Sequence, residues 1–201
     1  MKGKDVLLLI LLFVAVFAML ATCRHAYFPG DVTAEKFVQS LAPKSMSWAL
    51  WITKSAVFPW NLILLAITFA LSWALAGWRI ALFSILSFAG MWILGTLLSP
   101  VITRPRPSPA LVHVLGSPSG YSFPSIFALI YGSTAGFLAI LAALKKTGVL
   151  RTTLLILCSA LLIIGGIARI ALGAHWPSDI IISYFLALLW AFFLIRIAPK
   201  R

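Results

Sequence analysis

The stretch ARIALGAHWPSD, residues 168–179, places three side chains suited to anion chemistry at close intervals. Arg169 lies within an apolar run, His175 follows six residues later, and Asp179 follows four residues after that. Burying a charge in an apolar run is costly, so Arg169 is a functional candidate by default. A carboxylate beside an imidazole can fix its tautomer and leave the other ring nitrogen free as a nucleophile or base. The alternative is that Asp179 interacts only with the dipole of the helix that Pro177 opens.

Two further stretches contain groups that suit a phosphate. SPVITRPRP, residues 99–107, has two Arg–Pro pairs that favour extended backbone, and Arg106 belongs to the second pair. YSFPS, residues 121–125, leads into an apolar helix, and the free N–H groups at such a helix start, here at Ser125, favour an anion. Taken singly, the first stretch is a basic loop beside a membrane span and the second is a helix start. Together with Arg169 they predict a cradle for a phosphate, which the imidazole would face.

The elements that must position these groups are membrane helices. Of the 201 residues, 62% are hydrophobic and 10% are charged, and the mean hydropathy is +1.08. A soluble core of this size could not bury so much apolar surface. Residues 24–56 mix charges with aromatic side chains and predict a helical segment in the membrane interface. We expect an all-α bundle, forming one domain over residues 1–201, with six transmembrane helices at about 5–22, 57–77, 80–99, 124–144, 153–173 and 179–197.

The charge distribution predicts the orientation in the membrane. Sixteen basic residues against four acids give a net charge of +12. All of the basic residues except Arg169 lie in the connectors between apolar runs or near the ends of those runs, so they indicate topology, and nucleic-acid binding is the weaker interpretation. With the N-terminus inside, nine basic residues lie on the inner side and six on the outer side. We therefore expect cytoplasmic termini in a bacterial plasma (inner) membrane, with the 100–123 loop and the 174–178 turn on its outer face.

The three stretches resemble the motifs of the type 2 phosphatidic acid phosphatases, membrane relatives of the vanadium haloperoxidases. That family carries Lys-x6-Arg-Pro, Pro-Ser-Gly-His and Ser-Arg-x5-His-x3-Asp, and the third motif is nearly complete here. The resemblance extends to the six-span architecture. It implies that His175 is the nucleophile that forms a phosphohistidine and that Asp179 orients it. It also implies that Arg106 and Arg169 bind the phosphoryl oxygens with help from Ser125.

The chain departs from the family pattern at four positions. Ser99 stands where the first motif has Lys, and Ile126 and Phe127 replace the Gly and His of the second. Alanine at position 168 replaces the Ser that usually precedes the arginine of the third motif. An alternative alignment on SPSGY would put Tyr121 in place of the second-motif histidine.

The missing histidine changes the expected chemistry. In the family it is the general acid that protonates the departing oxygen, and losing a positioned acid costs about two to four powers of ten in rate. A phosphate leaving from a lipid diphosphate needs that proton less than an alkoxide leaving from a monoester. We therefore expect hydrolysis of a lipid (poly)phosphate such as undecaprenyl or another polyprenyl diphosphate, with a weakened acid step. His113 and Tyr121, in the same loop, are the candidate substitute donors.

Two other classes of function fit the same residues. A pseudo-phosphatase could keep the arginines and the His–Asp pair to bind or translocate a lipid phosphate carrier without cleaving it. A membrane scaffold is the third class, and Arg169 argues against it because an unused charge in an apolar run is expensive. The three histidines and four acids show no metal-ligand spacing, so we expect no metal or other cofactor. The partner that the resemblance implies is a lipid phosphate or diphosphate in the membrane.

Overall fold

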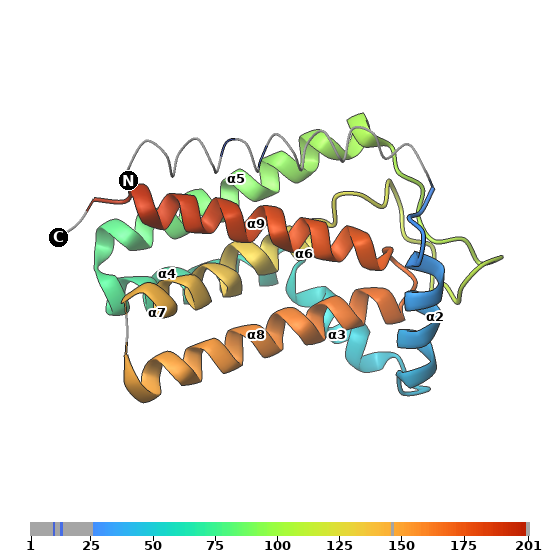
Figure 1. Cartoon of the computed structure of the whole chain (residues 1–201), viewed down its shortest axis with the longest axis horizontal. Coiled ribbons are helices and arrows are strands. Elements are labelled where there is room, and N and C mark those ends of the chain that lie inside the picture. Colours follow the sequence, from blue (N-terminus) through green and yellow to red (C-terminus); the bar gives the residue numbers. More distant parts are fainter. Residues whose placement is uncertain (1–9, 11–12, 14–25, 146, 200–201) are drawn as a thin grey trace.

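The computed structural model describes residues 10, 13, 26–145 and 147–199, and every regular element in them is a helix (Figure 1). The elements are α2 (Asp31–Leu41), α3 (Ser47–Ser55), α4 (Trp60–Ala76), α5 (Trp78–Ile102), α6 (Ile126–Tyr131), the π-helical turn η1 (Gly132–Gly136), α7 (Phe137–Lys145), α8 (Gly148–Ala171) and α9 (Pro177–Ile197). Over these residues the predicted all-α class is confirmed.

Four helical segments are long and apolar enough to cross a membrane. They are α5, the continuous segment Ile126–Leu144, α8 and α9, and each corresponds to a predicted span. The predicted span 57–77 coincides with α4, which has 17 residues and is shorter than the other four helical segments. The predicted span 5–22 lies outside the described residues apart from positions 10 and 13. The count of six spans therefore stays a prediction.

The long helices run side by side, and α2 lies at one end of the bundle (Figure 1). At that end lie α2, α3, the loop between α5 and α6, and the junction between α8 and α9. Aromatic side chains on α2 and α3 are exposed, among them Phe37 at 63% and Trp51 at 71%. The interfacial location of this segment remains a prediction.

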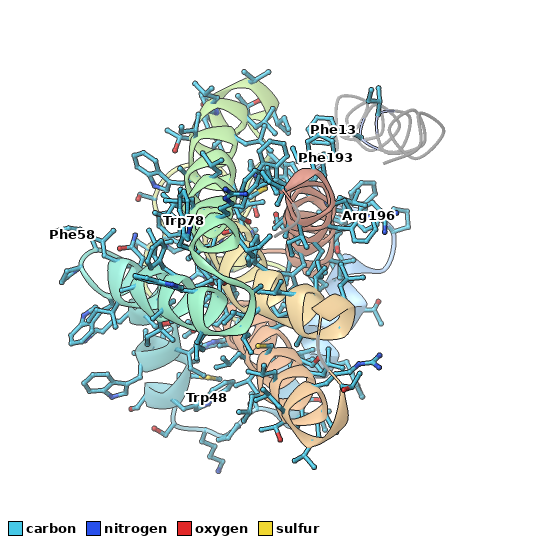
Figure 2. All side chains as sticks on the ribbon, turned by 90° about the vertical axis from the view of Figure 1, so that its left-hand side faces the viewer. Phe13, Trp48, Phe58, Trp78, Phe193 and Arg196 are labelled. Atoms are coloured by element: carbon cyan, nitrogen blue, oxygen red, sulfur yellow. The ribbon has the colours of Figure 1, made fainter. Side chains whose placement is uncertain are left out.

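The segment Ile126–Leu144 forms the centre of the bundle. Most of its residues are buried, whereas each of the other three candidate spans buries fewer than half. Two glycines in η1 let α9 approach closely: a Cβ at Gly132 would lie 2.6 Å from Cβ of Ala187, and one at Gly136 would lie 2.5 Å from Leu188 Cδ2. On the outside, the ring of Phe58 points away from the bundle (Figure 2), and Trp78 is also exposed, as suits side chains that face lipid or headgroups.

One carboxyl group on α2 is buried without a hydrogen-bonding partner. Glu35 is fully buried, and neither of its carboxyl oxygens accepts or donates a hydrogen bond among the described residues. Burial raises the pKa of Glu35 to about 8, and the negative charges of Asp31 and Asp179 act in the same direction. Glu35 is therefore protonated and neutral at pH 7.

A Glu35→Gln substitution is expected to stabilise the protein in a pH-dependent way. The folded chain holds a proton on Glu35 that the unfolded chain releases above pH 4.5, so the wild type loses stability as the pH rises from 4.5 to about 8. The variant should unfold at nearly the wild-type temperature at pH 4.5 and at increasingly higher temperatures toward pH 8. The free-energy difference should grow by at most about 1.4 kcal/mol per pH unit. Thermal unfolding in detergent measures this, and a difference that does not vary with pH would contradict it.

Candidate active site

Two connectors meet at the end of the bundle where α2 lies (Figure 1). One is the loop 103–125 between α5 and α6, and the other is the turn 172–176 between α8 and α9. The backbone N–H of Leu115 donates to the carbonyl of Leu172 at 2.9 Å. Gly173 makes this contact possible, because its φ is +66° and a Cβ there would lie 2.2 Å from the carbonyl oxygen of His113. The turn that carries the third motif is therefore held directly against the loop that carries the first.

A cavity of about 300 Å³ opens where these connectors meet α3, α5 and α6. Most of the predicted site residues line it: Ser99, Arg106, Tyr121, Ile126, Phe127, Arg169 and His175. Thr53 of α3 and Pro124 also belong to the lining. The structure thus brings together residues that the sequence separates by up to 76 positions, counted from Ser99 to His175.

The imidazole of His175 is buried and held by a backbone carbonyl. Its Nδ1 lies 2.7 Å from the carbonyl oxygen of Ser122, which can only accept, so Nδ1 carries the proton. Nε2 is then unprotonated and lies 3.4 Å from a terminal guanidinium nitrogen of Arg106. Burial holds the pKa of His175 well below its usual range, the positive charges of Arg169 and Arg106 act in the same direction, and the bond to Ser122 opposes them. His175 is therefore a neutral imidazole whose Nε2 can attack an electrophile.

Asp179 does not bond directly to His175, which differs from the predicted pair. Its Oδ2 lies 4.0 Å from Nδ1 of His175, beyond hydrogen-bonding distance. The carboxylate instead accepts from the hydroxyl of Ser122, from the backbone N–H of Trp176 at 3.0 Å, and from Arg104 at 2.5 Å. Asp179 thus caps the start of α9 and is linked to the imidazole by hydrogen bonds through Ser122.

Arg106 lies beside His175 and organises the loop. Its guanidinium donates to the carbonyls of Ser119, Gly120 and Ala174, with the shortest distance, 2.5 Å, to Ala174. These bonds tie the loop to the turn that carries His175. A bound anion would have to compete with those carbonyls for the N–H groups of Arg106, and a phosphoryl oxygen carries the greater negative charge.

Arg169 occupies the last turn of α8, where a positive charge suits the helix dipole. One terminal nitrogen donates to the hydroxyl of Thr53 at 3.2 Å, and its buried Nε has no partner among the described residues. The guanidinium carbon lies 5.7 Å from the ring centre of Phe127, which stacks on Tyr131 with 4.3 Å between ring centres. Donors of Arg169 thus remain available at the cavity.

Besides Asp179, two further predicted residues, Ser125 and His113, lie outside the cavity lining. The backbone N–H of Ser125 donates to the hydroxyl of Ser183 on α9 at 3.0 Å, and its own hydroxyl caps α6 at the N–H of Ala128. Its amide is therefore used within the protein and does not face the cavity. His113 exchanges backbone hydrogen bonds with the side chain of Gln39 and lines a different cavity. Tyr121, in contrast, shares the cavity with His175.

Three residues that organise the site were not predicted from the sequence. Arg104 is 3% exposed and lies between the carboxylates of Asp31 and Asp179, at 2.9 and 2.5 Å. Ser122 links Asp179 to His175 through its hydroxyl and its carbonyl. The first of the two Arg–Pro pairs was the available signal for Arg104, whereas no local pattern singles out Asp31 or Ser122.

The helical fold agrees with the comparisons with known proteins. The family model described as the PAP2 superfamily matches residues 77–201, well over half of the chain. The chain belongs to the PAP2 superfamily. The resemblance seen in the sequence motifs is thereby confirmed.

A crystal structure shares this PAP2 membrane fold. It is described as that of the first transmembrane PAP2 type phosphatidylglycerolphosphate phosphatase from Bacillus subtilis. The two align with a TM-score of 0.69 and 22% sequence identity, covering 96% of this chain and 98% of that one. No curated protein sequence matches the chain. With the four apolar helices, this fold identifies the chain as an integral membrane protein.

At pH 6.5, where an ordinary histidine is half protonated, the imidazole of His175 is expected to be neutral. Its 15N and 1H shifts, assigned by comparison with His175→Ala, should report an Nδ1-protonated neutral ring at pH 6.5. An Arg106→Gln substitution removes one of the nearby positive charges and should raise the pKa of His175. Half protonation of the wild-type ring near pH 6.5, or no response to Arg106→Gln, would contradict this account of the site.

Proposed function

We propose that this PAP2 protein is a membrane lipid phosphatase that cleaves a lipid diphosphate through a phosphohistidine on His175. The observation that carries the proposal is the hydrogen bond from Nδ1 to the carbonyl of Ser122, which leaves Nε2 unprotonated at a cavity that two arginines line. The family membership supports phosphatase chemistry in a membrane, and the choice of a diphosphate rests on the residues below.

The first chemical step uses a nucleophile and two positively charged side chains. Nε2 of His175 attacks the terminal phosphorus, a P–N bond forms, and the bridging P–O bond breaks with its electron pair leaving on the lipid monophosphate. Arg106 and Arg169 are positioned to stabilise the charge that gathers on the phosphoryl oxygens. Water then attacks the phosphohistidine, inorganic phosphate departs, and the electron pair of the P–N bond returns to Nε2.

The residue at position 127 determines which leaving group the site favours. Phe127 lines the cavity and its ring can supply no proton. A lipid monophosphate leaves as a stabilised anion, whereas a lipid alkoxide requires a proton from a positioned acid. Tyr121 is the candidate donor that shares the cavity, and its phenol would assist the more basic leaving group. A diphosphate therefore fits this site better than a phosphomonoester.

The same observations support a second function, that of a protein that binds or translocates a lipid phosphate without cleaving it. Phe127 is packed on Tyr131 and lies beneath Arg169, so the acid position is filled by an ordered apolar ring. The arginines would still hold a phosphate. In either case we place the site on the outer face of a bacterial plasma membrane with both termini cytoplasmic, on the distribution of basic residues.

Phosphate release from purified protein in detergent separates the two functions. We expect release from a polyprenyl diphosphate at a rate at least about 100-fold above that from phosphatidic acid, because the acid step limits the second substrate. His175→Ala is expected to abolish both reactions, since it removes the nucleophile. No release from either lipid, together with lipid binding that Arg169→Ala weakens, would establish the non-hydrolysing function instead.

Restoring the acid histidine tests the leaving-group argument. Phe127→His combined with Ile126→Gly is expected to raise hydrolysis of a monophosphate more than that of a diphosphate. Ile126 packs against Gly95, so the double variant also opens space, and Phe127→Leu with Ile126→Gly is the matched control without an acid. An equal gain on both substrates, or the same gain in the control, would contradict the argument.

A further inference from the structure

A carboxylate on α2 belongs to the buried charge cluster behind the cavity. Asp31 is 4% exposed, and its Oδ2 lies 2.9 Å from one terminal nitrogen of Arg104. The other terminal nitrogen of Arg104 lies 2.5 Å from Oδ1 of Asp179, which is fully buried. One guanidinium therefore joins two carboxylates from helices that lie far apart in the sequence, in a place that water does not reach.

Asp31 makes further bonds that fix its position. Its Oδ1 accepts from the backbone N–H of Ser178 at 3.0 Å, and its Oδ2 accepts from the Ser178 hydroxyl at 2.7 Å. Within its own segment it accepts from the N–H of Phe28 at 2.8 Å, and the Phe28 ring lies 4.8 Å from the guanidinium carbon of Arg104. The start of α2, the loop after α5 and the first turn of α9 thus share one carboxylate.

The cluster continues to the ring of His175 through Ser122. The hydroxyl of Ser122 donates to Asp179, and its backbone N–H donates to the carbonyl of Arg104 at 2.7 Å. Ser122 is therefore held on two sides by the residues that Asp31 anchors. Its remaining backbone group, the carbonyl, accepts from Nδ1 of His175 at 2.7 Å.

We propose that Asp31 is a positioning residue for His175, acting through Arg104, Asp179 and Ser122 on the direction and tautomer of the imidazole. This inference rests on the proposed function of the cavity. Asp31 lies outside residues 77–201, the part matched by the family model, so α2 contributes to the site from beyond that part. Without the Asp31 charge, Arg104 loses one of its two anionic partners and shifts, and the Ser122 carbonyl shifts with it.

The test compares Asp31→Asn with Glu35→Gln in the full-length protein at pH 7. Both changes convert a buried carboxyl on α2 into its amide one helical turn apart, but Glu35 has no hydrogen bond to the cluster and is already neutral at this pH. We expect Asp31→Asn to lower kcat for phosphate release by about 10- to 100-fold through misplacement of the nucleophile. KM should change little because Arg106 and Arg169 do not touch Asp31. Glu35→Gln should leave kcat unchanged, and equal losses in both variants would overturn the inference.

A double-mutant cycle tests whether Asp31 acts on His175 through Ser122. Ser122→Ala removes the hydroxyl that joins Ser122 to Asp179, so it should lower kcat in the same direction as Asp31→Asn. The combined variant should then be little worse than the poorer single one, since both break the same chain. Losses that multiply would show that Asp31 acts by another route. If Asp31→Asn does not fold, Ser178→Ala loosens the same cluster, and an unchanged kcat in both Ser178→Ala and Ser122→Ala would overturn the inference.

A measurement on the imidazole itself separates this inference from the proposed function. In the 15N spectrum of Asp31→Asn the Nδ1-protonated form of His175 should lose population relative to the wild type, whereas Glu35→Gln should match the wild type. This readout needs no turnover. A wild type that releases no phosphate would defeat the proposed function while the spectrum still decides the role of Asp31, and an unchanged spectrum in Asp31→Asn would overturn that role.

Discussion

The guanidinium of Arg104 is the group on which the arrangement of this site depends. A buried arginine is tolerated only where anions and hydrogen-bond acceptors replace its hydration, and two carboxylates and the Ser178 hydroxyl do so here. These partners come from α2 and from the start of α9, so satisfying one charge fixes three segments against one another. Removing Arg104 would leave two buried carboxylates without a positive partner in a place that water does not reach, which is far more costly than breaking an exposed pair.

This constraint changes how the imidazole of His175 is held. Because Asp179 forms its ion pair with Arg104, the imidazole of His175 is oriented by the neutral carbonyl of Ser122 and not by a carboxylate. A carbonyl fixes the tautomer but stabilises a positive imidazolium less than a carboxylate would. The described residues that line the cavity include two arginines and no acid. The described lining therefore favours a neutral ring and a ligand with several negative charges, in agreement with the diphosphate that we propose as substrate.

The sequence predicted what local patterns can specify. The spacing of Arg169, His175 and Asp179 placed them on the end of α8, the following turn and the first turn of α9, and the structure has that arrangement. Apolar runs likewise located the helices, because a membrane requires long apolar stretches whatever their packing. These features depend on neighbouring residues along the chain, so they can be deduced without knowledge of the fold.

Contacts between distant segments could not be deduced in this way. The amide of Ser125 suits a phosphate by local rules, but Ser183 of α9, 58 positions later, takes its hydrogen bond. Both Arg104 and Arg106 precede a proline, and spacing alone cannot decide which one lines the cavity and which one is buried. Asp31 lies 73 positions before Arg104, and only the packed bundle shows that they meet.

The phenylalanine at position 127 is integrated into the core and does not simply fill a vacancy. Its ring stacks on Tyr131, Arg169 lies over it, and Gly165 leaves room for it, since a Cβ there would lie 2.9 Å from the ring. The surroundings of residue 127 are thus adapted to an apolar ring. We infer that a site so adapted favours a leaving group that departs without a proton, or holds a phosphate without cleaving it.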